Sequence, residues 1–251
     1  MIDLHSHILR GIDDGARSLE DSLEIARAAV VDGITVIAGT PHVRDDWPTD
    51  AGVMEYRVAE LTAELEQAGI PLTVLRGGEI AIDWLDRLSF DELRRFGLGG
   101  NPRYLLVETP YYGWPLALTD RLFSLRDSGI TPVLAHPERS AEVQGDPERL
   151  VHLVRGGVLV QVTAASLDGR IGKRPQQTAR RLIEMGLAHL LASDAHSASI
   201  REVGMSAAAR TVGGRLADWL TRHVPAAIVD GTPLPPRPET PSGGRLRRLF
   251  R

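Results

Sequence analysis

Short runs rich in aliphatic and β-branched residues alternate along the chain with longer segments of helical periodicity. Strands separated by helices are joined by crossovers, which make neighbouring strands parallel. We therefore expect an α/β fold built on parallel strands. The seven strand-like runs are MIDLHSH (1–7), ITVIAGT (34–40), LTVLRGGEI (72–80), YLLVETP (104–110), TPVLAHP (131–137), VLVQVTA (158–164) and HLLASDAH (189–196).

The first helical segment shows how local signals support this alternation. Ser18 is a suitable N-cap, and Asp21 is placed to complete a capping box. Gly33 suits the end of the helix, because glycine tolerates the left-handed conformation found there. The apolar stripe between these signals consists of Leu19, Leu23, Ala26 and Val30.

The alternation fits a barrel, since α/β barrels commonly fill a chain of 251 residues as one domain. A doubly wound open sheet gives the same alternation, so closure is inferred from what the strand ends carry.

The composition changes from Gly231 onward, where GTPLPPRPETPSGGRLRRLFR combines many prolines with few side chains that can pack. We therefore predict one domain over residues 1–230 and a flexible Pro/Arg-rich tail over 231–251. The last seven residues carry four arginines and three large apolar side chains, which suit an acidic partner or peripheral contact with an anionic membrane. A solubilising tail without a partner is the equal alternative.

Overall composition narrows the function classes. The formal net charge of −4 gives no general attraction for nucleic acid, so we expect no nucleic-acid partner. The chain has no cysteine, which excludes disulfides and every thiolate nucleophile. It shows neither a signal peptide nor a run of about twenty apolar residues, so a cytoplasmic location is expected, and nothing signals an oligomeric state.

Potential metal ligands collect at the predicted strand ends. His5 and His7 lie two residues apart, so on a strand they point to the same side and can converge on one ion. Carboxyl ends of parallel barrel strands share one face, where a single pocket can gather ligands from several strands. The other candidates, each in or close to a later strand-like run except Asp14 in the first loop, are Asp14, His42, Glu79, Glu108, His136, Asp194 and His196.

This set of five histidines, two glutamates and two aspartates suits zinc, manganese or ferrous iron. It exceeds the ligands of one tetrahedral ion, and carboxylates can bridge ions, so we predict two or three metals. His152, His189 and His223 are interpreted as packing or surface residues. Asp13 is an alternative ligand, although it can equally accept backbone N–H bonds in the turn between Gly11 and Gly15.

The motifs DLHSHIL, GIDDGA, TPH, GGEI, AHPER and SDAH, in this order, resemble the polymerase and histidinol phosphatase (PHP) superfamily. Within it they are similar to the bacterial tyrosine-protein phosphatases associated with capsule and exopolysaccharide tyrosine kinases. The likeness extends over roughly residues 1 to 230.

The resemblance implies a distorted seven-stranded (β/α)7 TIM-like barrel, the PHP fold, with three divalent metal ions. Manganese is the favoured ion, with iron and zinc as alternatives. By position, Glu79 would bridge two ions. The resemblance places His5, His7, Glu79 and Asp194 on one ion, Glu79, Glu108 and His136 on a second, and Asp14, His42 and His196 on a third.

Two arginines match positions that the family uses to hold phosphate, namely Arg139 and Arg201. A guanidinium contacts two phosphate oxygens at once, which lysine cannot do. Two positions depart from the family: Arg10 replaces a common proline, and Val43 stands where many relatives have histidine. Both are expected around the pocket mouth, where they would affect substrate preference.

The resemblance predicts a protein-tyrosine phosphatase that acts on a bacterial tyrosine kinase or polysaccharide-assembly protein. The nucleophile would be a metal-activated hydroxide, because the chain has no thiolate to use instead. One alternative is a PHP phosphatase for a small monoester such as histidinol phosphate. A second is a non-catalytic, metal-stabilised binding module, against which the presence of the whole ligand set argues.

Overall fold

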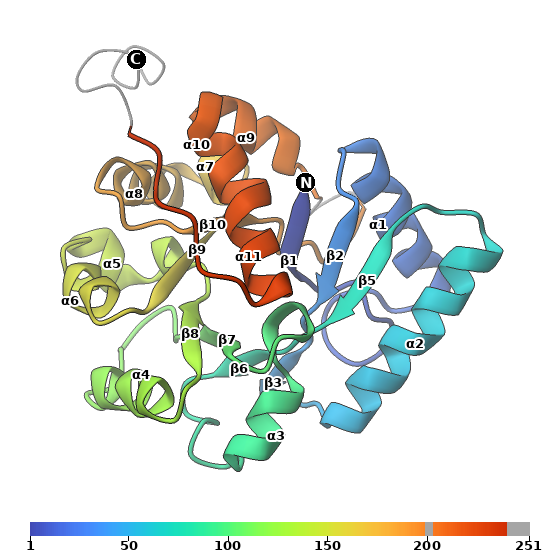
Figure 1. Cartoon of the computed structure of the whole chain (residues 1–251), viewed down its shortest axis with the longest axis horizontal. Helices are drawn as coiled ribbons and strands as arrows, with labels where there is room; N and C mark the ends of the chain where they lie inside the picture. Colours follow the sequence, from blue (N-terminus) through green and yellow to red (C-terminus); the bar gives the residue numbers. More distant parts are fainter. Residues whose placement is uncertain (199–202, 240–251) are drawn as a thin grey trace.

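A computed structural model of the chain describes residues 1–198 and 203–239. Arg201 and the arginine-rich end of the predicted tail therefore lie outside the described residues. The described part has strands at its centre and helices around them (Figure 1).

The strands form two sheets, with the orders β1-β2-β5 and β10-β9-β8-β7-β6-β3-β4. Among the described strands every pairing is parallel except that of β3 with β4. The strands are β1 (Ile2–Ser6), β2 (Val36–Gly39), β3 (His42–Arg44), β4 (Trp47–Pro48), β5 (Thr73–Arg76), β6 (Glu79–Ala81), β7 (Tyr104–Glu108), β8 (Thr131–Leu134), β9 (Leu159–Thr163) and β10 (Leu190–Ala192).

Each of the predicted strand-like runs contains a strand, so the α/β class with parallel strands is confirmed. The split of the run over residues 72–80 into β5 and β6 was not predicted. It falls at Gly77 and Gly78, where an added Cβ would lie 2.9 Å from Thr40 Cγ2 and 2.5 Å from Phe96 Cδ1. Glycine permits this close approach, and the chain passes from one sheet to the other there.

The carboxyl end of β1 also contacts the segment that follows β10. Ser6 and Ala195 form a parallel bridge. The His7 amide donates to the Ala195 carbonyl at 2.9 Å, and the Asp194 amide donates to the His5 carbonyl at 2.8 Å. Residues from the two ends of the domain are thereby held together.

The helices lie outside the strands (Figure 1). The predicted N-cap of α1 is confirmed, with the Ser18 side chain accepting from the Asp21 amide at 3.1 Å, whereas the Asp21 carboxylate accepts from the Arg17 amide at 3.0 Å. Leu23 and Ala26 of its stripe are buried. The helices are α1 (Leu19–Val31), α2 (Ala51–Gln67), α3 (Phe90–Arg95), α4 (Leu118–Asp127), α5 (Ala141–Gly145), α6 (Arg149–Arg155), α7 (Ala164–Asp168), α8 (Lys173–Glu184), α9 (Met205–Val212), α10 (Gly214–Asp218) and α11 (Val224–Asp230), with turns η1 (Leu98–Gly100) and η2 (Pro137–Arg139) and the π-helical η3 (Trp219–His223).

The first part of the predicted tail makes specific contacts with the domain, which differs from the unpacked segment expected from its composition. Trp219 Nε1 donates to the Pro235 carbonyl at 3.0 Å. The Arg237 guanidinium donates to the carbonyls of Ile183 and Ala188 at 2.8 and 2.9 Å and lies over the Trp219 ring. The Arg237 guanidinium thus donates to two carbonyls near the end of α8, a contact that the Pro-rich composition of the tail does not predict.

None of the described helices combines the length and the apolar character needed to cross a lipid bilayer.

Candidate metal centre

The candidate ligands converge at one end of the parallel strands. His42 and Glu79 are the first residues of β3 and β6, where the chain continues from β2 and β5, and Glu108 is the last residue of β7. His5 lies on β1 and His7 just beyond it, while Asp194 and His196 follow β10. Within this set only Asp14 is exposed, and the rest are buried. Within residues 1–198 and 203–239, four overlapping groups could each hold an ion: His7, Asp14, His42 and His196; His5, Glu79 and His136; His5, His7 and Asp194; and His42, Glu79 and Glu108.

Glu79 lies at the centre of this arrangement. Its Oε2 lies 3.4 Å from the Nε2 atoms of both His5 and His7, and its Oε1 lies 2.8 Å from His136 Nε2. His42 Nδ1 is 2.9 Å from Oε2. Burial alone would favour the protonated carboxyl, but the surrounding imidazoles, His5 foremost, hold the pKa of Glu79 well below its usual range.

Asp14 forms the outer part of the arrangement. Its Oδ1 lies 3.4 Å from His42 Nε2 and 3.3 Å from His196 Nε2. Partial burial opposes its charge, yet hydrogen bonding to these two imidazoles holds the pKa of Asp14 far below normal. Burial also opposes charge on His42, but Glu79 and Asp14 raise the pKa of His42 to about 9. Carboxylates therefore face His42 from two sides.

Among the candidate carboxylate ligands, Glu108 is the one whose negative charge is least balanced by its neighbours. Burial and the neighbouring charge of Glu79 raise the pKa of Glu108 to about 7. The Arg44 guanidinium lies 3.3 Å from its Oε2 and offsets part of this charge. Crowded carboxylates of this kind are the usual setting for divalent cations.

Buried polar atoms at the centre provide a test of whether metal ions fit. Among the described residues, His5 Nε2, His7 Nε2, His42 Nδ1 and Glu79 Oε2 have no hydrogen-bond partner of normal geometry. An unsatisfied buried polar atom costs about 1–3 kcal/mol, so several at one point call for a common partner. Since these atoms are lone-pair donors of imidazole and carboxylate, divalent metal ions fit the site.

Outer contacts fix the orientation of the histidines. Gln161 Oε1 accepts from His5 Nδ1 at 3.0 Å and from the His136 amide at 3.2 Å. Asp13 Oδ2 accepts from His7 Nδ1 at 2.7 Å and from the His42 amide at 3.1 Å. When Nδ1 carries the proton, Nε2 is left as the ligand atom, as in many metal sites.

Asp13 thus orients a histidine and also satisfies the turn, since its Oδ1 accepts from the Gly15 amide at 2.9 Å. Sequence reasoning missed Gln161, although a polar residue inside the apolar run VLVQVTA was a usable signal. Arg44 was also missed, because nothing in its neighbourhood marks it as a partner of Glu108.

The backbone contributes to the placement of two candidate ligands. His136 has φ of 30° and Asp194 has φ of 53°, and among the described residues they alone combine a side chain with positive φ. Such residues cost energy and often occur where function fixes the geometry.

Gly15 allows the first loop to pack directly against β1. An added Cβ there would lie 2.1 Å from the His7 carbonyl oxygen. Only glycine fits this position, so the loop that carries Asp14 can close over His7.

Arg139 lies at the edge of the cluster. Its Nη1 donates to Asp194 Oδ2 at 2.6 Å, and its guanidinium lies 4.8 Å from the centre of the Tyr111 ring. Tyr111 is 38% exposed and therefore faces both the site and solvent. Burial of part of its ring raises the pKa of the Tyr111 hydroxyl, which keeps it a hydrogen-bond donor at neutral pH.

Of the two positions that depart from the family, Val43 is not at the surface, where a pocket mouth would need it, and Arg10 is half-buried. Arg10 forms an ion pair with Glu60 of α2, at 2.5 Å, and Val43 is fully buried in β3. Neither lines the cavities beside Arg139 and Glu108. The predicted effect on substrate preference at the pocket mouth therefore has no support from their positions.

The histidines interpreted as structural lie outside the metal-binding groups of the described residues. His189 Nδ1 accepts from the Val160 amide at 3.1 Å. The His152 ring packs edge-on against Phe123.

Comparisons with known proteins agree with this geometry. A family model described as "Capsular polysaccharide synthesis, CpsB/CapC" matches residues 1–227. The chain is 39% identical over 203 residues to the tyrosine-protein phosphatase YwqE of Bacillus subtilis, covering 80% of this chain and 79% of that protein. It is 31% identical over 204 residues to the putative tyrosine-protein phosphatase CapC of Staphylococcus aureus, covering 80% and 79% of the two chains.

A solved structure is similar over nearly the whole chain. It comes from work on YwqE of Bacillus subtilis and CpsB of Streptococcus pneumoniae, described as unique metal-dependent tyrosine phosphatases. The TM-score is 0.87 at 34% identity, and the match covers 96% of this chain and all of that one.

Proposed function

The chain belongs to the CpsB/CapC family, and from this premise we propose that it is a metal-dependent protein-tyrosine phosphatase. The observation that carries the proposal is the convergence of the predicted ligands on Glu79, with Arg139 at the edge of the cluster. The substrate would be phosphotyrosine on a bacterial protein, namely a tyrosine kinase or a polysaccharide-assembly protein. This reading is favoured over a small-monoester phosphatase because the similar proteins are tyrosine-protein phosphatases.

The site would hold three divalent ions, with manganese as the favoured metal. Glu79 would bridge two ions in this proposal, which is supported by the contact of its Oε1 with His136 and of its Oε2 with His5 and His42. When bound, such ions lower the pKa of water and polarise phosphate oxygens. Asp13 and Gln161 keep the histidine Nε2 atoms directed into the cluster.

The side chains around the cluster would bind and orient the phosphate. Arg139 is held between Asp194 and the Tyr111 ring, so its guanidinium is directed to the site before substrate arrives. It would contact phosphate oxygens and balance the charge that develops on them. Arg201 is a second phosphate contact in the proposal, on the family resemblance.

The leaving group places modest demands on the protein. The hydroxyl of tyrosine ordinarily ionises with a pKa of about 10, so departure of the phenolate needs less help from an acid than that of an alkoxide. The Tyr111 ring lies 6.1 Å from the His136 ring, and its hydroxyl, protonated at neutral pH, would donate a hydrogen bond to a substrate oxygen.

We also infer that residues 1–230 form the phosphatase domain as a closed, distorted (β/α)7 barrel. The family match to residues 1–227 supports the domain extent. The continuation of β2 into β3 and of β5 into β6 supports one seven-strand circuit. The bridge between Ser6 and Ala195 supports its closure. A cytoplasmic location and a membrane contact by the tail remain predictions.

Metal removal tests the proposal. We expect turnover of a phosphotyrosine peptide and of an aryl phosphate to vanish with a chelator and to return with manganese. Histidinol phosphate should be a poor substrate under the same conditions. Activity that survived complete metal removal, or faster turnover of histidinol phosphate than of the peptide, would contradict the assignment.

A further inference from the structure

Two cavities share Tyr111 as a lining residue. One, of about 330 Å³, is lined among others by Tyr112, Arg139 and Arg174. The other, of about 260 Å³, is lined by Arg44 and Glu108 together with the acidic Asp45, Asp46 and Asp83. Each cavity therefore adjoins the candidate active site, at Arg139 in one case and at Glu108 in the other.

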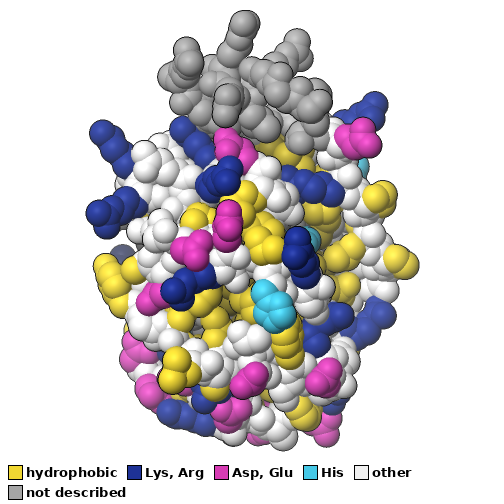
Figure 2. All heavy atoms as spheres, turned by 90° about the vertical axis from the view of Figure 1, so that its left-hand side faces the viewer, with side chains coloured by type: hydrophobic (Ala, Val, Ile, Leu, Met, Phe, Trp, Pro, Cys, Tyr) yellow, Lys and Arg dark blue, Asp and Glu magenta, His cyan; other side chains and the backbone are white. Residues whose placement is uncertain are grey.

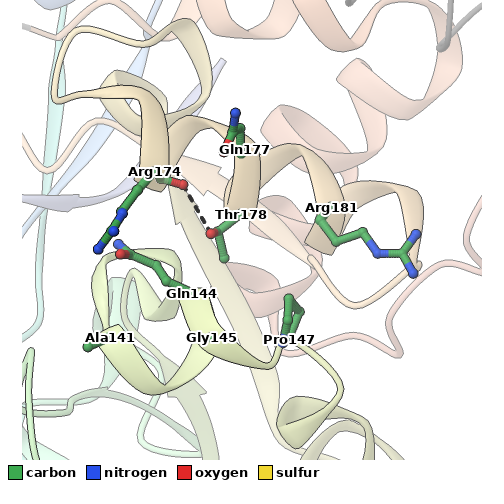
Figure 3. A pocket seen from close by; sticks show the side chains of 8 residues that line it. All are labelled: Ala141, Gln144, Gly145, Pro147, Arg174, Gln177, Thr178 and Arg181. Carbon is green, nitrogen blue, oxygen red and sulfur yellow. Dashed lines mark hydrogen bonds between the residues drawn. The ribbon is translucent and has the colours of Figure 1, made fainter.

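The cavity beside Arg139 continues into a larger one of about 520 Å³ between α5 and α8. The two share Ala141, Gln144 and Arg174 as lining residues, so they form one groove. In Figure 3, Gln144 of α5 and Arg174 of α8 face each other at one end, and Arg181 lies at the other. None of the described residues that line the groove is acidic.

Two arginines of the groove, Arg174 and Arg181, are available for a ligand. Among the described residues, the Arg174 guanidinium has no ion pair or hydrogen bond, and it is exposed. Arg181 is exposed and makes only a long contact, 3.9 Å, with Glu184. Figure 2 shows the face that includes α5, α6 and α8, where basic and acidic side chains are interspersed over apolar surface.

The groove runs along α8, as the spacing of its lining residues on this helix shows. Arg174, Thr178 and Arg181 follow at intervals of four and three residues, so they lie on one face of the helix. Two helical turns separate the arginines by about 10 Å along the axis. An extended peptide covers that distance in about three residues.

The cavity beside Glu108 has the reverse charge. Asp45 is paired with Arg87 at 2.5 Å and Asp46 with Arg44 at 2.8 Å, but Asp83 is exposed without an ion pair among the described residues. With Glu108 at its inner end, this cavity carries an excess of carboxylates. A substrate segment with negative charge is disfavoured there.

We propose that the groove from Arg139 past Arg174 to Arg181 binds acidic residues on one side of the substrate phosphotyrosine, while the acidic cavity beyond Tyr111 excludes them from the other side. This inference rests on the proposed phosphatase function and adds a substrate class to it. The occupant is an extended, acidic segment of the phosphotyrosine protein. Charge complementarity and the continuity of the groove with Arg139 select this occupant.

Three phosphotyrosine peptides test the proposal: one with acidic residues before the phosphotyrosine, one with them after it, and one with the matching amides. With the manganese-loaded protein, we expect one acidic peptide to exceed the amide peptide in kcat/KM by about fivefold. The other acidic peptide should be no better than the amide peptide. The preference should decline as ionic strength rises, because exposed charges are screened.

Reversing the charge of the groove arginines provides a second test of the proposal. In R174E and in R174E/R181E, the ratio between the preferred and the amide peptide should fall to about one or below. A ratio measured on the same protein cancels any general loss of activity. R155E is the matched control, since Arg155 is an exposed arginine on α6 that lines neither cavity, and it should keep the wild-type ratio.

Binding of non-hydrolysable phosphonate versions of the peptides, followed by fluorescence anisotropy, separates this inference from the proposed function. Arg174-dependent binding of an acidic peptide without any turnover would overturn the phosphatase function and leave the groove assignment standing. Equal kcat/KM and equal affinity for all three peptides would overturn the groove assignment. So would equal preference for both acidic peptides, or a preference that persisted in R174E/R181E.

Discussion

The two ends of β10 treat ionisable groups in opposite ways. At the amino end, burial and then the nearby Arg237 lower the pKa of His189 to about 4, so this histidine is neutral. At the carboxyl end, burial opposes charge on Asp194, but His5 and other cationic neighbours hold its pKa well below normal. The histidine at the amino end is therefore neutral, whereas the carboxyl end holds a charged carboxylate among cationic groups.

This contrast suggests that residues before β10 serve mainly stability, whereas residues just after it serve mainly activity. In parallel β/α proteins, carboxyl strand ends carry the active site and amino ends carry stability. Substitutions at the ligand end should therefore affect activity more than folding, and those near Arg237 and His189 should do the reverse.

The largest effect should follow from Glu79→Gln. The substitution keeps the shape of the side chain but removes the central charge, so we expect kcat/KM on an aryl phosphate to fall on the order of 10³-fold, with less bound metal. The unfolding midpoint of the metal-free protein should change little. Near-normal activity, or an unfolded variant, would contradict the division of activity and stability between the two strand ends.

Asp14→Asn should have a smaller effect, because this candidate ligand is 40% exposed at its side chain, whereas Glu79 is fully buried. We expect a loss of activity of about 10- to 100-fold, partly restored by excess manganese. Titrating activity against manganese measures this. If no manganese concentration restored activity, Asp14 would be as necessary for activity as Glu79.

Arg237→Ala tests the opposite end. It removes both donors to the Ile183 and Ala188 carbonyls, so the free energy of unfolding should fall by about 2 kcal/mol. Activity should stay within about twofold of wild type at a temperature where both are folded. Denaturant unfolding gives the comparison, with R155A as the control, and a large loss of activity in the folded variant would contradict it.

The smallest effect concerns pH. His189 has a folded pKa of about 4 against an ordinary value of 6.5, so its stabilising contribution is present above pH 6.5 and is lost as pH falls through 4. Allowing for its partial exposure, we expect about 1–2 kcal/mol from this group. His189→Asn keeps an acceptor for the Val160 amide without titrating, so its stability should decline less than that of wild type between these pH values. Parallel decline would show that His189 contributes nothing to the pH dependence.

Sequence reasoning predicted the strands and the converging ligands for one physical reason. A buried parallel strand needs a continuous apolar run, and the ligands follow such runs at VETP, AHP and SDAH. The passage between sheets at Gly77 and Gly78 was not predictable, because it depends on contacts with Thr40 and Phe96 from distant segments. The role of Gln161 and the packing of Arg237 likewise depend on partners far along the chain.

The left-handed backbone at His136 and Asp194 bears on how metal ions enter the protein. Both residues lie just beyond strands, β8 and β10, so we expect their torsions to be set when the sheet forms and not when an ion binds. Loading should then require little rearrangement of the polypeptide. Stopped-flow mixing of folded, metal-free protein with manganese should show an association phase that depends on metal concentration, without a slow concentration-independent phase.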